Sequence, residues 1–195
     1  MRSKKLGTLL ICAGLAMILA AVALLARNWR ESNTAGKVSG EVLPLLVEEI
    51  RERKDIAIDP LSPKMAAIPV DGHEYVGFIS LPTLGLALHV MEDWSEAKLK
   101  LSPCRYYGSV RGGDMVICAH NYAQHFGRLK ELKTGETALF TGLDGTVTRY
   151  AVAEVQVLDS SAVEDMISGD YPLTLFTCTY GGRSRVTVRC DFAID

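Results

Sequence analysis

Three side chains with complementary chemistry lie at or beside the ends of strand-like runs. Cys178 ends the run TLFTC at 174–178, His120 directly follows the apolar run MVICA at 115–119, and Arg185 opens the next strand-like run after the cysteine. A thiol can act as a nucleophile, an imidazole can carry a proton, and a guanidinium can stabilise an oxyanion. The sequence therefore contains the parts of a cysteine acyl-transfer site.

Each of these residues also has a purely structural interpretation. A free cysteine is most often buried, but a polar, loop-like stretch at 179–184 follows Cys178 and favours a partly exposed, ionisable thiol. His120 could equally be a hydrogen-bonded histidine of the core or the surface. Arg183 competes with Arg185 as the anion-binding group, but it lies inside the loop, where its position is less fixed. We therefore prefer Arg185, because a guanidinium stays charged and presents several donors.

The sequence gives little support for a metal. Cys118, His120 and His125 could be read as zinc ligands, but nothing clear supplies a further ligand at a fitting spacing. Glu92 and Asp93 form an acidic pair in a loop, which offers too few oxygen ligands for calcium and is better explained as solvated. We expect no cofactor and no metal, and a calcium requirement is unsupported.

The five cysteines do not form a disulfide framework. They lie at positions 12, 104, 118, 178 and 190, too few and too widely spaced to staple a small scaffold. Cys118 and Cys190 lie in apolar strand-like runs and are predicted to pack as small buried residues. A bridge between these two thiols is the alternative that the sequence leaves open.

From about residue 73 onward the chain is rich in short strand patterns. These are predicted at 75–81, 86–90, 114–119, 137–141, 146–157, 173–178 and 185–192, with short helical segments at 94–101, 126–132 and 163–167. Eight or so short strands with Gly-rich turns and few helices indicate a closed or nearly closed β-barrel, although the hydrophobic pattern alone does not separate a barrel from a sandwich. Arg189 shares a strand face with Arg185 and is predicted to be solvated.

The N-terminus carries an apolar segment of membrane-spanning length. Residues 6–26 are 21 residues without a charge, which as a helix would span roughly 31 Å. Three basic residues precede this segment and two follow it (Arg2, Lys4, Lys5, Arg27 and Arg30), so charge favours a cytoplasmic N-terminus only slightly. An uncleaved single-pass anchor is preferred over a cleaved signal peptide because the apolar run exceeds a usual signal-peptide core. Either interpretation places the remaining residues outside the cytoplasm.

Length and charge limit the remaining choices. The chain has 195 residues and a formal net charge of −2, which suits one domain with an appendage and gives no reason to expect nucleic acid as a partner. The predicted division is a cytoplasmic tip and transmembrane anchor at 1–27, a linker and N-terminal helix at 28–72, and a catalytic β-barrel at 73–195. Within the middle part, residues 32–40 are predicted to be a short linker beyond the membrane, and 42–53 a helix.

Three motifs together resemble the sortase family, the membrane-anchored cysteine transpeptidases of Gram-positive bacteria. TLFTC at 174–178 fits the TLxTC signature, MVICAHN at 115–121 is similar to the strand that ends in the catalytic histidine, and RVTV at 185–188 is similar to the strand that opens with the catalytic arginine. The order of elements from about 75 to 192 and the N-terminal anchor also fit. The resemblance implies an eight-stranded sortase β-barrel in the cell membrane, with its catalytic domain outside the cytoplasm.

The resemblance also implies a reaction and its residues. Cys178 would be the nucleophile, His120 the general acid and base, and Arg185 the stabiliser of substrate and oxyanion. The enzyme would cut an LPxTG-like sorting signal near the C-terminus of a secreted protein. It would then transfer the acyl group, through a Cys178 thioester, to an amine of a peptidoglycan precursor or a pilin.

Some positions depart from the family pattern. Ala119 stands where a glycine often precedes the histidine, and His89 stands where a proline is common. The loop at about 158–171 is short, unlike the long helical insertion of class B enzymes, and no pilin-type lid motif precedes the barrel. These departures favour a class D-like or unclassified clostridial type.

Competing interpretations fit the sequence less well. An L,D-transpeptidase usually places its cysteine in a Ser-x-Gly-Cys setting, which Phe176-Thr177-Cys178 does not match. An NlpC/P60-type peptidase has its cysteine before its histidine, the reverse of the order here. The non-enzymatic alternative is a membrane-tethered β-domain that binds cell-wall or protein partners without catalysis.

Overall fold

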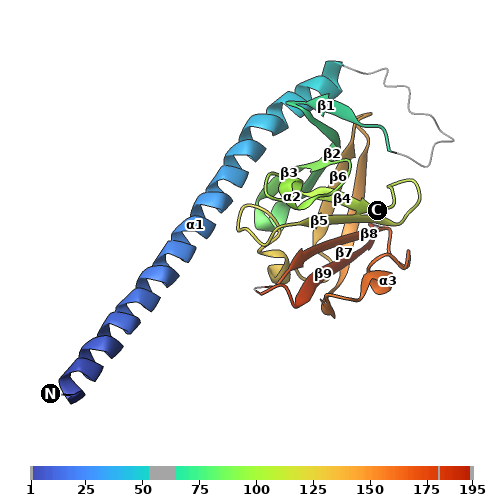
Figure 1. The fold of residues 1–195 in the computed structure, drawn as a ribbon. Helices are drawn as coiled ribbons and strands as arrows, with labels where there is room; N and C mark the ends of the chain where they lie inside the picture. The colour runs from blue at the N-terminus through green and yellow to red at the C-terminus, as the bar shows by residue number, and fades with distance from the viewer. Residues whose placement is uncertain (1, 53–64, 180, 194–195) are drawn as a thin grey trace.

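The computed structural model describes residues 2–52, 65–179 and 181–193. A long N-terminal helix, α1 (Arg2–Glu52), leads into a β-barrel with four short helical segments (Figure 1). The N-terminal part of α1 extends away from the barrel, whereas its C-terminal end lies beside β1 (Ile68–Val70). Within α1, Leu9–Thr34 is a candidate membrane span by length and hydropathy, and its most apolar window is not buried.

The prediction of a linker at 32–40 is wrong, because α1 continues through these residues without a break. The predicted helix at 42–53 is confirmed as far as Glu52, and residue 53 lies outside the described residues. Two glycines at 36 and 40 disfavour a helix locally, but Ser32, Val42 and Leu46 are buried against the rest of the protein. Tertiary packing of one helix face therefore outweighs the local propensity that suggested a linker.

The nine strands form a closed barrel of eight strands with one short addition. Their bounds are β1 (Ile68–Val70), β2 (His73–Leu81), β3 (Leu86–Met91), β4 (Cys104–Tyr107), β5 (Met115–Ala119), β6 (Thr137–Gly142), β7 (Val147–Asp159), β8 (Leu173–Cys178) and β9 (Ser184–Phe192). Neighbours run in the order β2-β3-β4-β5-β8-β9-β7-β6, and pairing of β6 with β2 closes the ring, while β1 pairs with β2 outside it. The prediction of a closed β-barrel is confirmed, and closure leaves few free strand edges.

The short helical segments lie in the connections between strands. They are η1 (Pro82–Leu84), α2 (Glu96–Leu99), η2 (Leu129–Glu131) and α3 (Val163–Met166). All but η1 fall within predicted helical segments, although only 129–131 of the predicted 126–132 is helical. Strand β4 was not predicted, because Cys-Arg-Tyr-Tyr is too short to show an alternating pattern.

Two clusters of buried side chains lie on opposite faces of the central strands. The inner cluster fills the barrel and contains residues such as Ile117, Leu175 and Val188. The outer cluster includes Cys118 and Phe176 and extends to Val42 and Leu46 of α1. Strands β5 and β8 are parallel neighbours covered on both faces, which explains why their sequences are nearly continuous apolar runs.

Candidate active site

Strand register brings the three predicted catalytic residues to one edge of the barrel. Cys178 at the end of β8 and Arg185 near the start of β9 are direct partners in the antiparallel pair. On the other side of β8, the parallel pairing with β5 ends at Ala119 opposite Thr177, so His120 follows at the level of Cys178. All three residues line one cavity of about 180 Å³.

Short hydrogen bonds fix the strand ends at this edge. The Thr177 hydroxyl is buried and donates to the Ala119 carbonyl over 2.8 Å, which joins the residue before Cys178 to the residue before His120. The Arg185 guanidinium donates through Nη1 to the carbonyls of Gly182 (2.9 Å) and Ser184 (3.2 Å) in the β8–β9 turn. These bonds use one of its nitrogens, and a guanidinium has five N–H donors, so further donors are available for an anion.

The walls of the cavity come from two connections of the barrel. Trp94, Glu96 and Leu99 line it from the β3–β4 connection, and Val163 and Met166 line it from α3. These walls were not assigned to the site from sequence, because neither connection carries a motif that marks it as part of a pocket.

Three aromatic rings that line the cavity contact one another in sequence. The Trp94 and Tyr106 ring centroids are 5.6 Å apart, and Tyr106 meets Phe176 edge-on at 5.2 Å. A cavity that combines these rings with a thiol, an imidazole and a guanidinium is suited to bind a peptide and transfer its acyl group.

Burial controls the charge of His120. Removal from water lowers the pKa of its imidazole, an effect reinforced by Lys100 and opposed by the carboxylates of Glu96 and Glu31. Its Nε2 atom is buried and has no hydrogen-bond partner among the described residues. A neutral imidazole at neutral pH can accept a proton, so this environment suits a group that exchanges protons with substrate.

The other thiols of the barrel are less suited to be nucleophiles. Cys178 and Cys118 both line the cavity, but Cys178 is half-buried, whereas Cys118 is only 3% exposed. Burial raises the pKa of Cys104 to about 12 and also raises those of Cys118 and Cys190. All are free thiols, and the Cys118–Cys190 bridge left open by the sequence is not formed, because the two lie in different clusters.

The prediction that Arg189 is solvated is wrong. Arg189 is 4% exposed, its Nη1 donates to Thr174 Oγ1 (2.9 Å) and to the Met166 carbonyl (3.3 Å), and its Nη2 donates to the Asp165 carbonyl. Its guanidinium also lies 5.5 Å from the centre of the Tyr171 ring. The sequence placed Arg189 on the correct strand face, but α3 covers that face, so Arg189 holds one wall of the cavity against the barrel.

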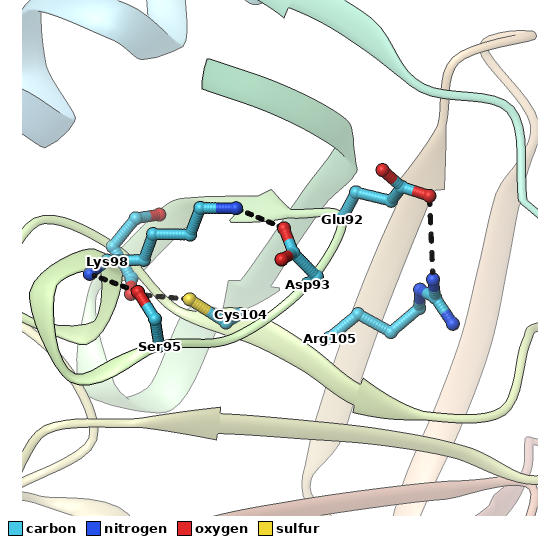
Figure 2. Close-up of polar contacts among 7 residues, drawn as sticks. Glu92, Asp93, Ser95, Lys98, Cys104 and Arg105 are labelled. Atoms are coloured by element: carbon cyan, nitrogen blue, oxygen red, sulfur yellow. Dashed lines mark hydrogen bonds and ion pairs between the residues drawn. The ribbon is translucent and has the colours of Figure 1, made fainter.

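The acidic pair in the β3–β4 connection takes part in ion pairs (Figure 2). Glu92 lies 3.9 Å from Arg105, and Asp93 is paired with Lys98. Ser95 caps α2 by accepting a hydrogen bond from the Lys98 amide over 3.2 Å. These contacts brace the connection that carries Trp94 and Glu96. In the part of the chain that the structure describes, no group of three or more His, Cys, Asp or Glu side chains is arranged to hold a metal.

The remaining histidines lie away from the cavity. His89 and His125 are fully buried, and burial lowers the pKa of each to about 4. His73 opens β2 and does not line the cavity. Of the four histidines, only His120, the one predicted from the sequence, lines the cavity together with Cys178.

Comparison with protein families matches residues 79–193, more than half of the chain, to the family described as "Sortase domain". The chain belongs to the sortase family. It is therefore an enzyme of the transpeptidase class, and its partners are of the kind that this family acts on, proteins with sorting signals. A search of curated proteins found no match.

Solved sortases share the fold over most of their length. Sortase D5 from Clostridium perfringens superposes with a TM-score of 0.63 at 18% identity, covering 81% of this chain and 99% of that one. Sortase C from Clostridium perfringens SM101 superposes with a TM-score of 0.56 at 20% identity, covering 87% of this chain and 99% of that one. Sortase A from Corynebacterium diphtheriae superposes with a TM-score of 0.57 at 20% identity, covering 92% of this chain and 96% of that one. Members of three sortase classes match similarly, so this likeness shows the fold and does not separate subclasses.

Proposed function

We propose that this sortase cleaves an LPxTG-like sorting signal on secreted proteins and transfers the acyl group to an amine of a peptidoglycan precursor or a pilin. The observation that carries the proposal is the convergence of Cys178, His120 and Arg185 at register-matched strand ends on one cavity. The nucleophile, the proton carrier and the anion-binding group lie in the same small site, which is the arrangement that acyl transfer needs.

In the first half of the reaction, the Cys178 thiol gives its proton to the neutral imidazole of His120, and its sulfur attacks the carbonyl carbon at the scissile bond. The negative charge that develops on the carbonyl oxygen is stabilised by N–H donors of Arg185. As the C–N bond breaks, the leaving amine takes a proton from the protonated His120, and a thioester on Cys178 remains.

In the second half, the acceptor amine attacks the thioester carbonyl. His120 takes the proton that the amine loses, an amide bond forms, and the C–S bond breaks. The proton then passes from His120 back to the Cys178 sulfur. A thioester reacts readily with amines, so the acyl group is held in a form that an acceptor can capture in competition with water. The same three side chains serve both halves, and we propose that no metal or cofactor takes part.

We also propose that the enzyme is a single-pass membrane protein. The candidate span in α1 supports this, and the basic residues Arg2, Lys4 and Lys5 favour a cytoplasmic N-terminus. The tip and anchor at 1–27 would then be followed by a juxtamembrane part at 28–72, in which α1 continues as helix, and by the catalytic barrel at 73–195. The barrel would meet its protein substrates at the outer surface of the membrane.

The test uses the full-length protein in detergent with fluorogenic LPxTG-like peptides and an added amine. Cys178→Ala, His120→Ala and Arg185→Ala are each expected to abolish nearly all cleavage and transfer. The matched controls are Cys12→Ala, His73→Ala and Arg183→Ala, which change the same residue types away from the cavity and are expected to keep activity.

Full activity of the Cys178→Ala protein would refute the proposal. Absence of thiol-dependent turnover in the parent protein with a broad peptide library would favour the non-catalytic binding domain instead. A library that reveals a preferred motif would also define the sorting signal.

A further inference from the structure

The loop that follows His120 is built around Tyr122, a residue that the proposed chemistry does not use. Tyr122 is 5% exposed, and its ring centroid lies 4.9 Å from that of His120 with 35° between the planes. The Tyr122 carbonyl accepts hydrogen bonds from the amides of His125 and Gly127, each over 2.9 Å, and the amide of Phe126 donates to the His120 carbonyl over 3.2 Å. The loop backbone is therefore fixed in a way that holds the Tyr122 ring against His120.

Tyr122 provides the aromatic contact of the His120 ring in the part of the chain that the structure describes. The buried Nε2 atom of His120 has no hydrogen-bond partner among the described residues. A catalytic imidazole is usually oriented by a third group, often through a hydrogen bond to its second nitrogen. Here the ring of Tyr122 packs on His120 and, at 5.6 Å between centroids, also on His125.

The phenol of Tyr122 is tied to α1, 91 residues earlier in the chain. Its hydroxyl donates to Oε2 of Glu31 over 3.1 Å, and Oε1 of the same carboxylate accepts from Nε of Arg27 over 3.0 Å. Both carboxylate oxygens are thus engaged, which restricts rotation of the Glu31 side chain. The helix is close to the loop here, since a Cβ added at Gly36 would lie 3.1 Å from the Gln124 side chain.

We propose that Tyr122 is a positioning residue for His120 and that Glu31 on α1 holds Tyr122 in place. The inference rests on the proposed role of His120 and extends it, because it makes the helix with the apolar N-terminal segment part of the apparatus that orients the catalytic imidazole. Without the bond to Glu31, the phenol moves more freely and the His120 ring samples more orientations. A smaller fraction of enzyme molecules is then ready for proton transfer.

This mechanism predicts an effect on kcat rather than on KM. Tyr122 and Glu31 do not line the cavity, so their loss removes no contact with a bound peptide. Proton transfer by His120, in contrast, is needed in both halves of the reaction.

The experiment measures kcat and KM for peptide cleavage and amine transfer with the full-length enzyme in detergent. Tyr122→Phe removes the hydrogen bond to Glu31, and Glu31→Ala removes the same bond together with the one from Arg27. Each variant is expected to lower kcat roughly three- to tenfold with KM unchanged. The double variant should be no slower than the slower single variant, because both changes break the same bond. Glu31→Gln keeps an acceptor oxygen and should recover part of the activity.

Glu48→Ala is the matched control on the same helix. It removes a glutamate that is paired with Arg51 at 3.6 Å and exposed, and it should leave kcat unchanged. Thermal unfolding of every variant in the same detergent separates catalysis from stability.

Unchanged kcat in both single variants, or losses that add in the double variant, would overturn the inference while leaving the proposed function standing. A lower Tm with unchanged kcat would also overturn it, since the contact would then be structural only. If the parent enzyme shows no thiol-dependent turnover, the proposed function fails, and this inference fails with it.

Discussion

Replacement of Arg189 by methionine should loosen one wall of the cavity and lower stability. The substitution keeps an unbranched apolar stem of similar reach but removes the guanidinium, which donates to Thr174 Oγ1 and to the carbonyls of Asp165 and Met166. It also removes the cation above the Tyr171 ring. The attachment of α3 to the β9 surface is then left to apolar contacts such as that of Met166 in the outer cluster and to the hydrogen bond from the Thr187 hydroxyl to the Met166 sulfur, 3.9 Å long.

The size of the effect follows from these contacts. Hydrogen bonds to a charged group contribute about 1.5–3 kcal/mol each, but burial of a guanidinium costs several kcal/mol, and the two α3 carbonyls can regain water when the wall loosens. The net loss of unfolding free energy should be about 2–4 kcal/mol. For a domain of this size, that corresponds to a fall in Tm of roughly 5–15 °C.

Thermal unfolding of the full-length protein in detergent measures this loss, and Arg149→Met, which changes an exposed arginine on β7, is the control. Because Val163 and Met166 line the cavity, KM for the donor peptide should also rise, and amides of α3 should exchange faster with solvent. A Tm within about 2 °C of the parent, with unchanged exchange in α3, would refute the conclusion that Arg189 holds this wall.

Two further predictions concern pH and metal ions. His89 and His125 have a folded-state pKa of about 4, below the unfolded value of about 6.5, so the unfolded state binds more protons between these pH values. Stability should therefore fall as pH drops from about 6.5 to about 4, by up to about 3 kcal/mol for each histidine. The double variant His89→Asn/His125→Asn should flatten the dependence of Tm on pH, and an unchanged slope would contradict this account. For metals, treatment with EDTA followed by gel filtration should leave peptide cleavage unchanged, because Glu92 and Asp93 are engaged with Arg105 and Lys98. Activity that is lost with EDTA and restored by calcium would show that the site depends on a metal.

Much of the active site could be predicted from local sequence pattern. Cys178, His120 and Arg185 each stand where a strand ends or begins, and strand ends are visible because apolar runs stop there. Strands β5 and β8 were predicted within one residue of their bounds, since they are covered on both faces and therefore read as nearly continuous apolar runs.

Errors arose where a distant part of the chain changes the environment of a residue. Residues 32–40 have the composition of a linker but are helical, because α1 packs one face against the barrel and against the loop at Tyr122. Arg189 has the pattern of a solvated strand position but is buried, because α3 from the β7–β8 connection folds over it. The loop at Tyr122 is distant in sequence from residues 32–40, and α3 is distant from Arg189. A local sequence pattern therefore could not reveal either contact.

The sequence by itself determined the types of the candidate catalytic groups, their places at strand ends, the mainly β class and the apolar N-terminal segment. These properties depend on residue identity and on periodicities of a few residues, which are local. Only the tertiary structure decided that β6 pairs with β2 to close the barrel, that α3 and the β3–β4 connection form the cavity walls, and that Glu31 reaches Tyr122. These contacts join segments that are far apart in the chain. They depend on strand register and on which surfaces are buried against one another, and a local sequence pattern specifies neither.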